Sequence, residues 1–291
     1  MKVKQSRQDK TLDVINTVIL IICSFITLYP MYLVAISSFS GGTYVARGEV
    51  TFLPKAITLA SYKVLMQDSY FTISMLNTVY YTVLCTVVNL FMSVLCAYPL
   101  SIKTFSGRKP IMKFITITMF LSGGMISSYL VVKSLGLLDS VWALVLPGAI
   151  STYNMIVIRS FFEGLPGELR ESAFIDGAND IVMLFKITIP LSLPVLATMT
   201  LFYATGTWNS YFSALLYISE KSKYPVQLIL RNMLIDDLMG EEYANMVSET
   251  DIVPLTLKYA SIMIATVPIL LIYPFVQKYF VKGALVGSLK G

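Results

Sequence analysis

The residues of this chain that offer chemistry within apolar segments are hydroxyls, amides and aromatic rings. Tyr203, Thr207 and Tyr211 stand at positions i, i+4 and i+8, which one face of a helix would present together. Sugars carry hydroxyl groups and apolar C–H faces, and such side chains complement both. Helix packing and an aromatic belt at a membrane interface are alternative explanations of the same residues. The residues considered for a substrate path are Tyr203, Thr207, Trp208, Asn209, Tyr211, Tyr153 and Asn154.

The sequence lacks residues and motifs that catalysis and metal binding commonly require. The 291 residues include no histidine, which removes the commonest metal ligand and general base. Cys23, Cys85 and Cys96 all lie in apolar runs, without the spacing of a disulfide framework or a zinc site. No phosphate-binding GxxxxGK[ST] loop occurs in the sequence. We therefore expect no catalytic residue, no metal site and no cofactor bound by this chain.

The composition indicates a membrane protein. Charged residues make up 13% of the chain, against about 25% in soluble domains, and the mean hydropathy is +0.71. Six runs reach the roughly 20 apolar residues that a membrane-spanning helix needs. They are Val14–Ser38, Ile73–Ile102, Phe114–Val132, Val141–Phe162, Ile189–Tyr217 and Tyr259–Gln277. The sequence predicts an all-α polytopic membrane protein with six transmembrane helices.

Two features of these runs need an interpretation. Val14–Ser38 is longer than the 7–15 apolar residues of a cleaved signal peptide, so we read it as a span. Gly123-Gly124, in the third run, is expected to serve close helix packing, with a helix break as the alternative. Ionisable residues are absent from the runs apart from Arg159, which argues against an autonomous carrier driven by proton or sodium coupling.

The distribution of charge predicts the orientation in the membrane. Positive residues collect in short cytoplasmic segments, and Met1–Lys10 carries four of them. With this end inside, the inner segments sum to +7 and the outer segments to −2, which together give the net charge of +5. Both termini are therefore expected in the cytoplasm. The basic balance indicates topology and not nucleic-acid binding.

From the end of the fourth run into the start of the fifth lies a charged, turn-containing segment, Glu168–Pro194. Leu165, Leu169 and Ala173 recur every four residues and so predict a short helix. Gly177 breaks this pattern, and a second short helix is expected before the next apolar run. Such a helix-turn-helix at a membrane surface is typical of a docking element.

The spacing within this segment resembles the EAA loop of ABC-type import permeases. The resemblance rests on Glu171-Ser172-Ala173, Asp176-Gly177-Ala178 and Ile187-Thr188-Ile189-Pro190. The sequence departs from the pattern at Ser172, in place of Ala, and at Ile189, in place of Leu. In that family the loop is the coupling helix, which sits in a cleft of a cytoplasmic ATPase. The coupling residues that the resemblance implies are Leu169, Glu171, Ser172, Ala173, Phe174, Asp176, Gly177, Ala178 and Pro190.

The resemblance also implies an architecture. It predicts the type I ABC importer permease fold, with residues 1–72 leading into a core at 73–277, a coupling loop at 164–190 and a tail at 278–291. Leu169, Ala173 and Phe174 would contact the ATPase, and Ala173 would be small so that the helix seats deeply. Softer matches at Phe161-Phe162, Leu165-Pro166 and in the tail favour the carbohydrate branch, in the manner of the second permease of a maltose-type importer.

The implied partners are a second homologous permease, two ATPase subunits that bind ATP and magnesium, and an external or periplasmic binding protein. The expected location is the bacterial cytoplasmic membrane, with no nucleic acid involved. The acidic excursion with Asp236, Asp237, Glu241 and Glu242 is either solvated or packed on the binding protein. Alternatives are an importer of another solute, such as a peptide or glycerol phosphate, an autonomous secondary carrier, and a structural scaffold.

Overall fold

The computed structural model describes residues 7–235 and 254–288, with side chains described for residues 10–235 and 254–272. It divides into two compact units, residues 1–69 with 232–266 (unit 1) and residues 70–231 with 267–291 (unit 2). The expected core of 73–277 is therefore shared between the units. The acidic residues Asp236, Asp237, Glu241 and Glu242 lie outside the described residues.

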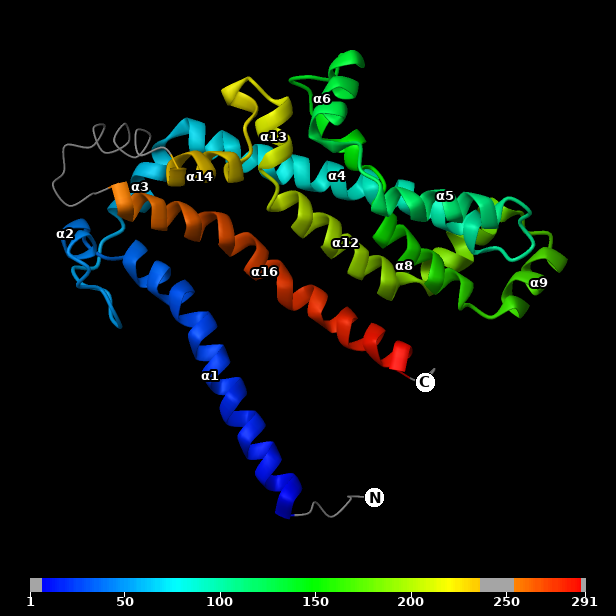
Figure 1. Ribbon diagram of the computed structural model, residues 1–291, viewed down its shortest axis with the longest axis horizontal. Coiled ribbons are helices and arrows are strands. Elements are labelled where there is room, and N and C mark those ends of the chain that lie inside the picture. Colours follow the sequence, from blue (N-terminus) through cyan, green and yellow to red (C-terminus); the bar gives the residue numbers. More distant parts are fainter. Residues whose placement is uncertain (1–6, 236–253, 289–291) are drawn as a thin grey trace. The chain divides into compact units, whose positions relative to one another are not determined.

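Unit 1 is built from helices joined by a short folded segment (Figure 1). Its helices are α1 (Arg7–Ser38), α2 (Gly42–Ala46), α3 (Ala60–Gln67) and the first part of α16 (Pro254–Ser288). Ile36, Val45 and Val50 form a small core on which Tyr259 of α16 packs. Ser61 Oγ in α3 donates a hydrogen bond to Thr256 Oγ1 in α16 at 3.0 Å. The apolar side chains along most of α1 are exposed, as suits a helix that faces lipid or another chain.

Unit 2 has α4, α8 and α12 side by side, with α9 beyond one end of them (Figure 1). The helices of unit 2 are α4 (Ser69–Ser101), α5 (Arg108–Phe120), α6 (Gly124–Ser134), α7 (Trp142–Val145), α8 (Thr152–Glu163), α9 (Gly167–Ile175), α10 (Asp180–Val182), α11 (Ile189–Leu191), α12 (Leu193–Trp208), α13 (Phe212–Tyr217) and most of α14 (Val226–Ile235). The 3₁₀ turns η1 (Leu146–Gly148) and η3 (Lys221–Lys223) and the π-helix η2 (Met183–Thr188) connect them. Side chains from α4, α8, α9, η2 and α12 share one core.

Three of the six predicted spans are unbroken helices and three are bent pairs. Helices α1, α4 and α16 are each long and apolar enough to cross a membrane. The other spans bend by 115° between α5 and α6, by 54° before α8 and by 83° before α12. Counting each bent pair as one span gives up to six, in line with the six apolar runs.

The bend between α5 and α6 corrects one expectation. Gly124 has φ +79°, a left-handed conformation that other residues resist, and a Cβ built on it meets nothing within 4 Å. The expectation that Gly123-Gly124 serves close packing is therefore wrong. The pair instead marks the helix break.

Prolines account for the bend before α12. Pro190 has no N–H to donate and its ring crowds the carbonyl four residues earlier, which favours the wider π-helical turn of η2 directly before it. Pro194 sits in the first turn of α12, where a missing N–H costs little. The expected second short helix of the loop is thus continuous with the beginning of the fifth span.

The hydroxyl group of Tyr203 links α12 to two neighbouring elements by hydrogen bonds. This hydroxyl lies 2.6 Å from Ser93 Oγ in α4 and accepts a hydrogen bond from the backbone N–H of Ser151 at 3.2 Å, directly before α8. The side chain is 6% exposed, so neither partner has water as a ready substitute.

We expect Tyr203→Phe to lower the free energy of unfolding in detergent by about 1–3 kcal/mol, because buried groups lose their partner. Tyr211→Phe is the matched control, since Tyr211 is 40% exposed. The measurement is the thermal or denaturant midpoint of both variants. Equal midpoints for the two variants would contradict the role given to Tyr203.

Asp139 holds the loop between α6 and α7 against the residues that follow α13. Its backbone has φ +56°, which Asp adopts more readily than most residues. Its Oδ1 accepts hydrogen bonds from the N–H groups of Ser219 at 2.5 Å and Glu220 at 3.0 Å. These two bonds lower the pKa of the Asp139 carboxyl, because they stabilise its charged form.

The lowered pKa gives a direction to the pH dependence of this loop. Stability from a carboxyl of lowered pKa is present above its unfolded pKa, near 3.9, and is lost as the pH falls through its folded pKa. We expect hydrogen exchange at the Ser219 and Glu220 amides to stay protected from pH 7 to about pH 5 and to lose protection only under stronger acid. Asp139→Asn keeps the backbone preference without the charge, and should lose protection already at pH 7. Wild-type protection in that variant would refute the charge effect.

Candidate functional site

The loop of residues 164–190, here called the motif loop, begins with helix α9 and its cap. Helix α9 starts after Pro166, and Glu168 in its first turn complements the positive end of the helix. At the other end, Gly177 N donates to Phe174 O at 3.1 Å and Ala178 N to Ala173 O at 2.9 Å. These two bonds form a Schellman motif, which requires the left-handed φ of +84° at Gly177.

Ala173 faces the interior of this same chain. It is 7% exposed and belongs to the core that also contains Tyr98 and Leu100 of α4 and Met183 of η2. We expected the small side chain to let the helix seat in an ATPase. The structure corrects this point, because the small side chain lets α9 seat against α4 and η2.

Large apolar side chains around α9 face outward. Leu169 and Phe174 are 37% and 41% exposed, and Ile175 is 86% exposed. Ile181, after the turn, is 68% exposed. The sequence interpretation named Leu169 and Phe174 but missed the two isoleucines. The sequence did indicate their exposure, because an isolated β-branched residue in a charged, turn-containing segment has no local apolar cluster in which to be buried.

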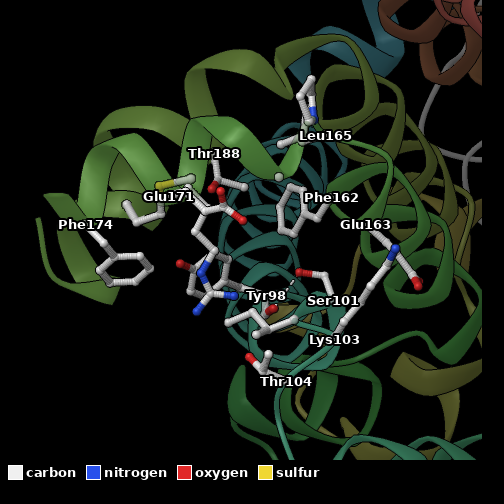
Figure 2. A pocket seen from close by; sticks show the side chains of 15 residues that line it. Tyr98, Ser101, Lys103, Thr104, Phe162, Glu163, Leu165, Glu171, Phe174 and Thr188 are labelled. Atoms are coloured by element: carbon white, nitrogen blue, oxygen red, sulfur yellow. Dashed lines mark hydrogen bonds between the residues drawn. The ribbon is translucent and has the colours of Figure 1, made fainter.

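A pocket of about 440 Å³ lies between the end of α4 and the motif loop (Figure 2). Tyr98 and Ser101 contribute from α4, and Glu171 and Phe174 from α9. The Ser101 hydroxyl donates to Tyr98 O at 2.6 Å, which uses a carbonyl of the last turn of α4. The pocket therefore lies between α9 and the end of α4, while Ala173 of α9 belongs to the core that α4 shares.

Arg170 connects α9 to α10 beside this pocket. Its guanidinium lies 3.2 Å from Asp180 Oδ1 and 5.2 Å from the centre of the Phe174 ring. Tyr98 donates to the same Asp180 oxygen at 3.4 Å. Asp180 is largely exposed, so the ion pair contributes less than about 1 kcal/mol and mainly orients the loop.

A second charged group joins three helix ends. Arg159 Nε donates to Leu100 O at 2.8 Å, and Arg159 pairs with Glu163 at 2.9 Å. Arg108, in the first turn of α5, pairs with the other oxygen of Glu163. The single arginine of the fourth predicted span is therefore paired. It ties α4, α5 and α8 together next to the motif loop.

The remaining residues of the motif loop are placed as follows. Ser172 is exposed, and its hydroxyl donates to Leu169 O at 3.3 Å. Glu171, Asp176 and Pro190 are exposed, whereas Ala178 is half-buried against the core around Ala173. Among the residues that the structure describes, no three His, Cys, Asp or Glu side chains are grouped as metal ligands.

The expected single face from Tyr203 to Tyr211 is not formed. Helix α12 ends at Trp208, so Tyr211 lies beyond it and does not continue its face. Tyr203 and Trp208 are buried, whereas Asn209 and Tyr211 are exposed. Asn209, the residue directly after α12, donates from Nδ2 to Thr205 O in the last turn of that helix at 2.9 Å.

The two residues predicted from the fourth span also separate. In α8, Tyr153 is 54% exposed, whereas Asn154 is 7% exposed. Of the residues considered for a substrate path, Thr207 lines a cavity of about 160 Å³ between α4 and the segment that follows α12.

The cap of α9 generates a stability prediction. Because the site of Gly177 has open space, Gly177→Ala adds only backbone strain, and we expect a loss of about 1–2 kcal/mol of unfolding free energy. Gly206→Ala, inside α12 with open space and no positive φ, is the matched control and should not destabilise. Denaturant midpoints in detergent measure both, and an unaffected Gly177→Ala would rule out the strained cap.

Comparison with known proteins places this geometry in a family. Residues 89–285 match the family described as binding-protein-dependent transport system inner membrane component. The chain is 42% identical over 285 residues to the polygalacturonan/rhamnogalacturonan transport system permease protein YtcP of Bacillus subtilis (strain 168). That alignment covers 98% of this chain and 100% of YtcP. This chain is also 43% identical over 290 residues to protein LplC of the same organism, and that alignment covers 98% of this chain and 97% of LplC.

A solved structure agrees with these relatives. A chain of a bacterial ABC transporter involved in the import of the acidic polysaccharide alginate superposes with a TM-score of 0.91 at 35% identity. The match covers 96% of this chain and 100% of that one. Relatives of this kind are permease subunits and not enzymes. The chain therefore belongs to the family of inner membrane components of binding-protein-dependent transport systems, and is a multi-pass permease subunit with the type I ABC importer fold.

Proposed function

We propose that this permease subunit forms part of the path by which an ATP-driven importer carries an oligosaccharide into the cell. Support comes from relatives named for polygalacturonan and rhamnogalacturonan transport and for alginate import. The low number of charges in the predicted spans suits a path that does not use ion coupling.

The motif loop is proposed as the contact with the ATPases. The observation that carries this is the two-sided character of α9, which buries Ala173 in the chain's own core and exposes 86% of Ile175. An exposed isoleucine directly after Phe174 offers an apolar contact that a partner's cleft would cover. ATP and magnesium are bound by two separate ATPase subunits, and this chain binds neither.

The structure supports a way for movement at α9 to reach the spans. The core around Ala173 contains side chains of α4, α8 and α12, and close-packed cores transmit displacement because they have few voids. Closure of the ATPases would move α9, and α9 would rock the three helices with it. The path would then open alternately to the outside and to the cytoplasm.

The remaining partners and the topology are also proposals. A second, homologous permease completes the path, and an external or periplasmic binding protein delivers the sugar. Both termini lie in the cytoplasm of a bacterial cell, as the charge of +7 on the inner segments supports. We keep residues 73–277 as the proposed permease core and 278–291 as its cytoplasmic tail.

The test uses Ile175→Asp in the native membrane, with purification in mild detergent and mass spectrometry of the associated chains. We expect an ATPase and a second permease to accompany the wild-type chain. The charge should release the ATPase and reduce sugar uptake by at least about tenfold, because a buried apolar contact is replaced by an unpaired carboxylate.

Ile57→Asp is the matched control, since Ile57 is 75% exposed and lies in unit 1. It should leave both the ATPase and uptake in place. Recovery of the ATPase with Ile175→Asp would remove α9 as the contact. A wild-type chain that purifies without any ATPase would remove the whole proposal.

A further inference from the structure

A pocket of about 640 Å³, here called the basic pocket, lies where α4 ends and α5 begins. Its cations are Lys103, Arg108, Lys109 and Arg159, and none of its lining residues is acidic. The rest of its lining comes from Thr104, Phe105, Ser106 and Met112. Lys103 and Thr104 also line the pocket at the motif loop (Figure 2), so the two pockets are neighbours.

The chain neutralises the positive charge of the basic pocket only in part. Glu163 pairs with both Arg108 and Arg159, so these three side chains carry a net charge of +1. Lys103 and Lys109 are exposed, and neither has a salt bridge among the described residues. The pocket together with Glu163 therefore carries +3. Like charges this close repel one another, which favours a negative group in the space between them.

The donors of the basic pocket suit a phosphate group. Nη2 of Arg108 donates to Glu163 Oε1, whereas its Nε and Nη1 have no acceptor among the described residues. Thr104 and Ser106 add hydroxyls, and the positive end of α5 begins at Arg108. Guanidinium and ammonium groups form short, charge-assisted hydrogen bonds with phosphate oxygens.

The position of the pocket and the surface of α5 indicate that the phosphate belongs to a lipid. Helix α4 is long and apolar enough to span a membrane, and α5 is the first half of a bent span, so the pocket lies where two spans meet the membrane surface. Lys109, Lys113 and Ile117 are spaced by four residues, and Phe120 continues the same face. Ile117 and Phe120 are 44% and 80% exposed, and no residue of α5 is buried.

The length of this face matches an acyl chain better than a soluble partner. At 1.5 Å per residue, Phe120 lies about 16 Å along the helix from Lys109. A lipid whose phosphate sits in the basic pocket can therefore lay its acyl chains along the apolar part of α5. A water-soluble protein or a free phosphate can reach the cations but leaves the apolar part uncovered.

We propose that the basic pocket binds the phosphate of an anionic phospholipid whose acyl chains lie along residues 113–120 of α5. A zwitterionic phospholipid suits the pocket less, because its ammonium group would join four cations. The proposed topology puts the site in the cytoplasmic leaflet, where basic pockets between spans bind anionic headgroups. The inference goes beyond the proposed function and holds whichever sugar is carried.

The experiment uses the intact transporter with its partner chains in nanodiscs of phosphatidylcholine. Two photoactivatable probes, a phosphatidylglycerol and a phosphatidylcholine, carry the same diazirine in the middle of one acyl chain and are added in turn as a minor component. After illumination, mass spectrometry measures the labelled fraction of residues 114–121. A further arm adds inorganic phosphate in place of chloride at constant ionic strength.

We expect phosphatidylglycerol to label this segment at least about fivefold more than phosphatidylcholine, a preference of about 1 kcal/mol. Lys103→Gln combined with Lys109→Gln should reduce the preference to less than about twofold. These two lysines are chosen because Arg108 and Arg159 also hold Glu163. Thermal midpoints show whether the double variant folds, and each single variant, with a smaller loss of preference, takes its place if it does not.

Lys10→Gln combined with Lys186→Gln is the matched control, because it removes two exposed positive charges from the same side of the membrane in the proposed topology. It should keep the full preference. An equal loss in this control would show a general attraction to positive surface and would overturn the site.

Four other results would also overturn the proposal. Equal labelling by the two probes would remove the selectivity, and a preference that survives the substitutions at Lys103 and Lys109 would remove the pocket. Absence of labelling by either probe would mean that another chain covers α5. Loss of the phosphatidylglycerol label on adding inorganic phosphate would assign the pocket to a soluble phosphate instead of a lipid.

Discussion

The burial of Ala173 anchors α9 to the rest of unit 2 at that end. This small side chain belongs to the core that also contains Tyr98, Leu100 and Met183. A larger side chain would hold α9 away from this core, since close-packed interiors do not accept added volume without strain. The Schellman cap at Gly177 then turns the chain back toward α10, so that Asp180 meets Arg170 and Tyr98.

The same contact separates two roles within the motif. Residues that keep α9 attached to this chain point inward, and those available to a partner point outward. Ile175 and Ile181 are the most exposed large apolar side chains of the motif loop. A surface of this kind is stable only while it is covered, or while it remains small enough to tolerate contact with water.

The helix, the turn and the family could be predicted from the sequence, because all three depend on local residue spacing. The period of Leu165, Leu169 and Ala173 predicted a helix, and Gly177 predicted its end; the structure confirms both. Which side of α9 is buried could not be predicted, because a four-residue period defines a face without saying what covers it. The extended face from Tyr203 to Tyr211 was wrong, since the helix ends at Trp208 and no local signal marked that end.

A row of uncharged polar side chains on α4 escaped notice for a related reason. Thr82, Thr86 and Asn89 carry no charge and sit among apolar residues, so a search for ionisable groups passes over them. Only the tertiary packing shows that Thr82 Oγ1, Thr86 Oγ1 and Asn89 Oδ1 are buried without a hydrogen-bond partner among the described residues. Unpaired hydroxyls and amides depend on long-range contacts, which a single sequence does not reveal.

The three bent spans have a consequence for the lipid around the protein. Where α5 gives way to α6, and again before α8 and α12, backbone groups leave the helical pattern at positions within the predicted spans. Hydrocarbon cannot hydrogen-bond such groups, so each bend must face protein or a water-filled space. Acyl chains can therefore line the uninterrupted helices α1 and α4 over long stretches, but at these three bends the annulus of lipid must give way to protein or water.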